Sequence, residues 1–255
     1  MGIDWRGSNG LETTIILAYL RFALGYLVLF IGAIPIVLML IVLLPFRVLR
    51  IRGALAMGRY VSYAVMACIG VKVRFEGTDP KQLRPAIFIA NHTSTLDVFL
   101  FAVSAPTGSS AIIKKEMVYV PILGQLALLS GHLLIDRHHR NRALEAIAMI
   151  GALVRAKGLS VFIMPEGTRS TDGSIQPFKR GFVHLACATG LPVVPLVFHG
   201  AAKRWPMGAW TVDPGEVCIE VLDPISSEGW SSDDAGLIAD QMQQVFTDAL
   251  SRFHE

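Results

Sequence analysis

One long hydrophobic run dominates the start of the chain. Residues Phe22–Phe46 include no charged side chain, and about 20 apolar residues are enough to cross a bilayer as a helix. Pro35 lies inside the run and removes a backbone donor, so a bent or re-entrant segment is the alternative to a straight span. The run is too long for a cleavable signal peptide and lacks a small-residue cleavage site. It therefore predicts a membrane-associated helical segment.

Basic residues follow this run directly, at Arg47, Arg50 and Arg52. If the run spans a bilayer, this positive cluster favours a cytoplasmic position for everything that follows it. The next apolar stretch, Ala54–Val71, contains Arg59 and so favours an amphipathic or interfacial helix over a second span. The alternative is that both helices simply cover a globular core.

The pattern changes near residue 70, where short apolar runs begin to alternate with helical periodicity. The runs predicted as strands are Val71–Phe75, Ala86–Ala90, Ala111–Lys114, His132–Asp136, Ser160–Met164, Val193–Phe198 and Val217–Leu222. Strands that alternate with helices predict an α/β fold with a mostly parallel mixed sheet flanked by helices. We therefore divide the chain into hydrophobic membrane-anchoring helices over residues 1–70 and an α/β domain over residues 71–255.

Two helices of this domain are predicted by apolar positions at helical spacing. The first has the face Leu144, Ile147, Ala148, Gly151 and Val154, and it ends at Lys157, before Gly158. The second follows Ser231–Asp234, whose side chains suit a helix N-terminus, and has the face Ile238, Met242, Val245, Ala249 and Phe253.

Composition narrows the function classes. The chain is 53% hydrophobic, which is more than an ordinary soluble domain, and its net charge is only +3. Its basic residues nevertheless cluster, and such clusters attract phosphates, anionic head groups or acidic carrier proteins. The clusters lack interleaved aromatic residues, so no nucleic-acid partner is expected. The three cysteines lack paired spacing, which is typical of reduced thiols in a cytosolic compartment.

Polar side chains follow three of the predicted strands, at the ends where parallel sheets gather ligands. They are Asn91-His92, Arg137, and the stretch from Glu166 to Arg169. Because three separate strands end in this way, the sequence predicts a catalytic site at that edge of the sheet.

His92 and Asp97 suit acid–base chemistry if a strand-to-helix turn brings them together. They lie five positions apart, about 140° on a continuous helix, so one helix would not let them face each other. A carboxylate on one ring nitrogen fixes the tautomer and leaves the other nitrogen free to take a proton from a hydroxyl. The alternative is a capping box in which Asp97 stands at the third helical position after Ser94.

The stretch from Glu166 through Gly167 and Thr168 to Arg169 joins an acid, a flexible backbone position, a hydroxyl and a guanidinium group. Arginine binds phosphate through a planar fork of donors, although a surface turn with an ion pair is the alternative. Lys114 ends a predicted strand and either points into the same cleft or lies solvated beside Lys115.

Other chemistries are disfavoured. His138 and His139 have no further ligands at metal-binding spacing, and Ser94 does not lie in a nucleophile elbow, so neither a metal nor a covalent serine is expected. The apolar stretch Val120–Leu129 is either one wall of a groove for an acyl tail or a plain core helix.

Four blocks in order resemble the glycerolipid acyltransferase family, and especially its bacterial 1-acyl-sn-glycerol-3-phosphate acyltransferase group. The blocks are "NHTSTLD" (Asn91–Asp97, the HX4D motif), "GHLLIDR" (Gly131–Arg137), "MPEGTRS" (Met164–Ser170) and "LPVVPLVF" (Leu191–Phe198). The resemblance covers about residues 70–200. Met164 and His132-Leu133 differ from the residues that the family usually has at these positions. Because of the difference at His132-Leu133, the resemblance predicts acyl transfer more firmly than it predicts the head group of the acceptor.

The resemblance implies that His92 is the general base and that Asp97 orients it. Glu166, Gly167, Thr168 and Arg169 would hold lysophosphatidic acid, with Arg169 on the phosphate, and Lys114 and Arg137 would contact phosphate or donor. The donor would be acyl-CoA or acyl-ACP, with no metal or other cofactor and no covalent acyl-enzyme.

The resemblance and the apolar N-terminus together imply an enzyme of phospholipid biosynthesis at the inner membrane. Its partners are membrane lipids, and its catalytic domain faces the cytoplasm. The alternatives are another lysolipid acceptor, such as lyso-ornithine lipid, and a non-catalytic lipid-binding protein.

Overall fold

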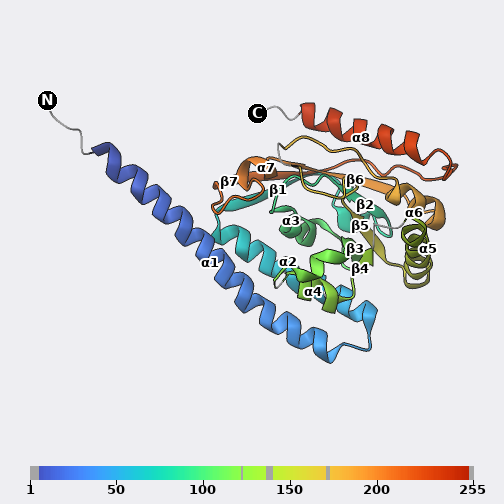
Figure 1. Cartoon of the computed structure of the whole chain (residues 1–255), viewed down its shortest axis with the longest axis horizontal. Coiled ribbons are helices and arrows are strands. Elements are labelled where there is room, and N and C mark those ends of the chain that lie inside the picture. The colour runs from blue at the N-terminus through green and yellow to red at the C-terminus, as the bar shows by residue number, and fades with distance from the viewer. Residues whose placement is uncertain (1–5, 122, 136–139, 171–172, 253–255) are drawn as a thin grey trace.

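A seven-stranded sheet organises the chain in the computed structural model, which describes residues 6–121, 123–135, 140–170 and 173–252 (Figure 1). The strands are β1 (Val71–Gly77), β2 (Ile87–Ala90), β3 (Ser109–Lys114), β4 (Leu133–Ile135), β5 (Ser160–Ile163), β6 (Val193–His199) and β7 (Gly215–Val221). The helices are α1 (Arg6–Val42), α2 (Arg47–Cys68), α3 (Asp97–Ser104), α4 (Leu123–Ser130), α5 (Arg140–Lys157), α6 (Gly181–Thr189), α7 (Ala201–Arg204) and α8 (Ala235–Arg252), with 3-10 turns at Pro80–Gln82 and Lys115–Tyr119.

The strands lie in the order β1-β7-β6-β2-β5-β3-β4, and every neighbouring pair is parallel except β6 with β7. The predicted α/β class with a mostly parallel mixed sheet is therefore confirmed. Each predicted strand is present, within two residues at either end. β2, β5 and β6 are buried at every position, because helices cover both faces of the sheet and remove the usual alternation of polar residues.

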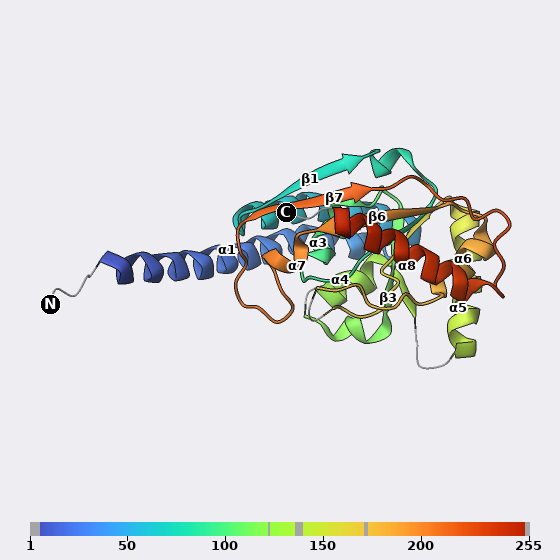
Figure 2. The same ribbon diagram turned by 90° about the horizontal axis from the view of Figure 1, so that it is seen from above.

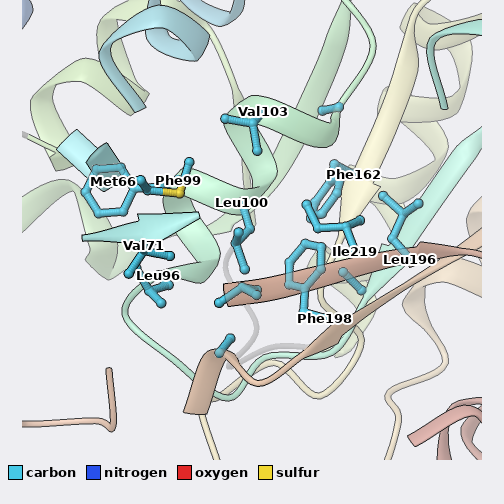
Figure 3. Close-up of a cluster of buried hydrophobic side chains, with 14 of the residues drawn as sticks. Met66, Val71, Leu96, Phe99, Leu100, Val103, Phe162, Leu196, Phe198 and Ile219 are labelled. Carbon is cyan, nitrogen blue, oxygen red and sulfur yellow. The ribbon is translucent and has the colours of Figure 1, made fainter. Parts of the chain in front are cut away.

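The two faces of the sheet bury separate hydrophobic cores. One face packs against α2 and α3, in the cluster that Figure 3 shows around Met66, Phe99 and Leu100. The other face packs against α5, α6 and α8, with Phe182 and Phe246 completely buried. α8 lies across the sheet from α1 and α2 in Figure 1. The strands thus form the middle of three layers, which leaves their carboxyl ends free to carry polar loops.

The N-terminal helices form a hairpin with a turn at residues 43–46. α1 is one helix through Pro35, so the alternative of a segment that turns back at this proline is not observed. Its stretch Ile15–Val42 has a mean hydropathy of 2.7 and is 28% buried, and it is long and apolar enough to cross a membrane. The N-terminal half of α1 extends away from the other elements in both views (Figures 1 and 2).

α2 begins at Arg47, seven residues before the predicted start. It buries Leu55, Val65 and Met66 in the core shared with α3 and the sheet. The Arg47 Nε–H donates to the Gly131 carbonyl at 3.0 Å, and Arg50 donates to the Leu129 carbonyl. Part of the basic cluster therefore fastens α2 to the C-terminal end of α4, and α2 is a core helix of the fold. The division of the chain at residue 70 stays a prediction.

Both helices predicted in the second half are present, with small errors in their faces. α5 ends at Lys157, before Gly158 at φ 59°, as predicted, but Ala148 is exposed and Ile150 is buried instead. On α8, Phe246 is completely buried and Val245 only partly. Neighbouring positions lie about 100° apart on a helix, so an apolar pattern leaves the edge of a buried face undetermined. Phe253 lies outside the described residues.

Candidate active site

A turn after β2 brings His92 and Asp97 together. Asp97 is the first residue of α3, and its Oδ2 accepts hydrogen bonds from His92 Nδ1 at 2.7 Å, Thr93 N at 2.8 Å and Ser94 N at 2.9 Å. The Asp97 side chain is fully buried, whereas that of His92 is 21% exposed. Because Oδ2 is an acceptor, Nδ1 carries the hydrogen and Nε2 keeps its lone pair on the open side of the ring.

The structure is compatible with both interpretations of Asp97, as the partner of His92 and as the acid of a capping box. Asp97 reaches back to the Ser94 N–H, as an acid in a capping box does, yet α3 begins only at Asp97. The Ser94 hydroxyl donates to the Trp205 carbonyl at 2.7 Å and accepts from Leu96 N at 3.0 Å. It is therefore occupied by structural contacts. Asn91 is occupied in the same way, because its amide pairs with the backbone N–H and C=O of Phe198.

Glu166 joins the loop after β5 to the histidine turn. Its Oε1 accepts from His92 N at 2.6 Å and its Oε2 from Gln176 N at 2.9 Å, and the residue is only 1% exposed. Burial raises the pKa of this carboxyl group to about 7, against the opposing effect of the two backbone donors. In the same loop, Ser170 N donates to the His92 carbonyl at 3.0 Å. These contacts favour a positioning role for Glu166, since backbone amides occupy both of its oxygens.

Arg169 and Lys114 supply positive charge to the cavity that His92 lines. Arg169 Nη1 donates to Thr95 Oγ1 at 3.2 Å, so a hydroxyl within the HX4D motif orients the guanidinium group. Gly167 adopts φ +73° in the turn that leads into Thr168 and Arg169. The Lys114 ammonium lies 3.9 Å from Glu116 and is 46% exposed, so this exposed pair holds it weakly. Arg137 lies outside the described residues.

These side chains share one cavity of about 460 Å³. His92, Lys114, Gly167, Thr168 and Arg169 line part of it, and the rest is mainly apolar. The apolar walls come from α1 through Leu29, Ala33 and Ile36, from α2 and α3, and from the strands β3 and β5. On α4, Leu123, Gly124, Leu126 and Ala127 also line it. Of the two alternatives for residues 120–129, the structure favours a cavity wall over a plain core helix at these positions, and its use by an acyl tail stays a prediction.

His132 also lines the cavity, and the sequence indicated it only as a departure from the second block. Its Nδ1 accepts a hydrogen bond from the Ala111 N–H at 3.3 Å. Its ring packs edge-on against that of Phe101, with the ring centroids 5.9 Å apart. Burial, with a smaller effect of Arg47, lowers the pKa of the His132 imidazole to about 4. Its ring is therefore neutral at physiological pH. No local pattern could reveal this role, because the wall of the cavity assembles from distant segments.

His132 should make folding sensitive to acid. Its folded-state pKa of about 4 lies below the unfolded value of 6.5, so the unfolded chain binds the proton first as the pH falls. We expect this residue alone to lower the free energy of unfolding by about 2 kcal/mol between pH 7 and pH 5. Denaturant unfolding of His132→Gln at both pH values should show a correspondingly smaller acid loss than the wild type. An equal loss in both proteins would contradict this assignment.

A second histidine–carboxylate pair lies at the β6–β7 side of the sheet. His199 Nε2 is 2.8 Å from Glu220 Oε2, and Arg252 is 3.6 Å from the other oxygen of Glu220. Neither His199 nor Glu220 lines the cavity that contains His92. In the described part of the chain, no group of three His, Cys, Asp or Glu side chains is placed to hold a metal ion.

Comparison with known proteins shows the family of this chain. The family model described as "Acyltransferase" matches residues 72–199, and the chain belongs to that family. It is 34% identical to a 1-acyl-sn-glycerol-3-phosphate acyltransferase of Cocos nucifera over 237 residues, 93% of this chain and 77% of that relative. A protein of the same name from Haemophilus influenzae is 27% identical over 69% of this chain and 73% of its own length.

The fold has a solved counterpart. The crystal structure of the 1-acyl-sn-glycerophosphate (LPA) acyltransferase from Thermotoga maritima matches with a TM-score of 0.71 and 23% identity. The match covers 96% of this chain and 99% of that one, so the whole architecture is shared, including the N-terminal helices.

Proposed function

We propose that this protein is a 1-acyl-sn-glycerol-3-phosphate acyltransferase. It moves a fatty acyl group from a thioester to the sn-2 hydroxyl of lysophosphatidic acid and so makes phosphatidic acid for phospholipid biosynthesis. The observation that carries the proposal is the His92–Asp97 pair, which lies beside a guanidinium group at a mainly apolar cavity. The named relatives at 27–34% identity support the same reaction.

The geometry supports direct transfer with His92 as general base. Its Nε2 takes the proton of the acceptor hydroxyl while that oxygen attacks the thioester carbonyl carbon. The new C–O bond forms, the C–S bond breaks, and the imidazolium returns the proton to the leaving thiolate. Asp97 holds the ring in the required tautomer and stabilises the positive charge that forms on it. Because the Ser94 hydroxyl is held by Trp205 and Leu96, no covalent acyl-enzyme is proposed.

The acceptor phosphate lies, in this proposal, on Arg169, with Thr95 holding the guanidinium group in place. Lys114 adds a second cation at the same cavity. Gly167 and Thr168 contact the acceptor, and Glu166 acts through the backbone of His92. Arg137 keeps its proposed role as a phosphate or donor contact on the family resemblance alone.

The donor is acyl-CoA or acyl-ACP, and its hydrocarbon chain occupies the apolar part of the cavity between α1, α2 and α4. Membrane lipids surround α1, whose large apolar side chains are widely exposed. We place the enzyme at the inner membrane with the site on the cytoplasmic face. The supporting observations are the basic residues Arg47, Arg50 and Arg52 after α1 and the free cysteines.

A lysolipid panel tests the proposal. The full-length protein in detergent is offered one acyl-CoA together with lysophosphatidic acid, lysophosphatidylcholine, lysophosphatidylethanolamine or lyso-ornithine lipid. We expect transfer to lysophosphatidic acid. Transfer only to lyso-ornithine lipid would keep the chemistry and replace the acceptor. No transfer to any acceptor would leave a non-catalytic lipid-binding protein as the explanation.

Arg169→Ala should weaken acceptor binding more than it slows chemistry. A hydrogen bond to a charged group contributes about 1.5–3 kcal/mol, so we expect KM for lysophosphatidic acid to rise roughly ten- to hundredfold. KM for acyl-CoA should stay nearly constant. The matched control is Arg84→Ala, since Arg84 is exposed and donates to the Thr107 carbonyl, away from the cavity. An unchanged KM for the acceptor would remove Arg169 from the phosphate site.

A further inference from the structure

The cavity is lined by polar side chains other than those of the candidate active site. They are Ser62, Ser130 and His132. The Ser130 hydroxyl already donates to the Ala127 carbonyl at 2.9 Å. His132 differs, because one of its ring nitrogens has no partner within the described residues.

The hydrogen bond to Ala111 fixes which nitrogen that is. Nδ1 accepts the Ala111 N–H, and the ring is neutral, so the remaining ring hydrogen is on Nε2. Within the described residues, the His132 side chain makes the hydrogen bond to Ala111 and no second one. The residue is partly buried and lines the cavity, so an occupant that lacks an acceptor at this place would displace water and leave the Nε2–H unpaired, which is unfavourable.

The sheet register shows how far His132 lies from the reacting atoms. Its partner Ala111 pairs with Phe162 on β5, and Phe162 pairs with Phe88 on β2. Ala111 therefore lies two strand spacings, roughly 10 Å, to the side of Phe88, and His92 lies four residues beyond Phe88, past the end of β2. With the cavity assigned to the acyl chain, His132 faces the chain away from its thioester end.

We propose that His132 forms a subsite for an oxygen atom on the acyl chain. Through this subsite the enzyme prefers donors whose chain carries a hydroxyl or keto group at one interior position over plain chains of the same length. A plain chain that reaches His132 displaces water and leaves the Nε2–H unpaired, whereas an oxygen at that depth accepts its hydrogen bond. Sites built around a buried polar group reject analogues that lack the matching group. The inference rests on the proposed function, because it assigns the cavity to the acyl chain.

A competition assay with the full-length enzyme tests the subsite. Plain acyl-CoA is mixed with an equal amount of a hydroxyacyl-CoA of the same length, and lysophosphatidic acid is the acceptor. The hydroxyl is moved along the chain from one experiment to the next. We expect the ratio of kcat/KM, hydroxylated over plain, to reach roughly tenfold or more at one interior position. A ratio of one or less at every position would overturn the subsite, without any need for a variant.

Variants then connect the preference to one side chain. His132→Phe keeps an aromatic ring but removes both nitrogens, and the ratio should fall to about one. His132→Gln keeps a donor and should retain part of the preference. The control is Ser130→Ala, which removes a cavity hydroxyl that is already bonded and should leave the ratio unchanged. An undiminished ratio in His132→Phe would overturn the assignment to His132.

The two proposals fail in different ways. Equal transfer of plain and hydroxylated chains overturns the subsite alone and leaves the acyltransferase function intact. Absence of transfer from every donor, with every lysolipid acceptor, overturns the function and the subsite with it.

Discussion

His92→Ala lowers the turnover number for acyl transfer by roughly a thousandfold or more, if His92 is the base proposed above. The protein should stay folded, because the His92 ring is partly exposed and its removal still leaves the backbone N–H groups of Thr93 and Ser94 on Asp97 Oδ2. The acceptor and donor KM values should change little, since the imidazole acts on the proton and not on the phosphate. Steady-state kinetics at saturating concentrations of both substrates measures the effect.

The matched control is His184→Ala. His184 lies on α6 and contacts Ser232, and it does not line the cavity. Its replacement should leave turnover unchanged. If His92→Ala kept the wild-type rate, His92 would not be the general base. If His184→Ala lost as much activity as His92→Ala, the loss would reflect a general disturbance of the fold.

Asp97→Asn is expected to slow turnover by roughly a hundredfold, which is less than the loss of His92 itself. The two backbone N–H groups require an acceptor at the position of Oδ2, so the asparagine carbonyl oxygen must take that place. That oxygen still accepts the Nδ1–H and preserves the tautomer. The negative charge that stabilises the imidazolium is lost, and this loss slows the reaction.

The same substitution should also destabilise the fold. The Asp97 Oδ1 atom is buried and has no hydrogen-bond partner in the described part of the chain. In the variant an amide NH₂ takes this place, and an unpaired buried donor costs about 1–3 kcal/mol. Denaturant unfolding measures this cost, and Asp248→Asn on the exposed face of α8 is the control. A turnover loss equal to that of His92→Ala would mean that the tautomer is not preserved.

The sequence predicted well whatever depends on local patterns. Central strands such as β2 and β6 are continuous apolar runs, because both of their faces are buried, and such runs are visible without a structure. The proximity of His92 and Asp97 was also predictable, since a strand-to-helix turn links them over a short distance in the chain. The stretch from Gly167 to Arg169 reaches the same cavity because parallel strands bring their carboxyl ends to one edge of the sheet.

Other features depend on contacts between distant segments, which local patterns do not encode. The sequence did not reveal that the backbone N–H groups of His92 and Gln176 donate to the two oxygens of Glu166, whose role in substrate binding stays a prediction. Arg47 and Arg50 resembled residues at a membrane surface, yet they bind the end of α4. His132 looked like a simple exchange within a motif, yet it lines a cavity whose walls come from α1, α2, α3, α4, β3 and β5.

The position of α1 has a practical consequence for anyone who wishes to handle this enzyme in solution. Leu29, Ala33 and Ile36 belong at once to the apolar N-terminal hairpin and to the chamber beside the histidine. A shortened protein without the hairpin would therefore have an open-sided chamber, and detergent molecules would compete with fatty chains for the same space. Reconstitution into nanodiscs with the first 42 residues in place preserves the chamber during purification.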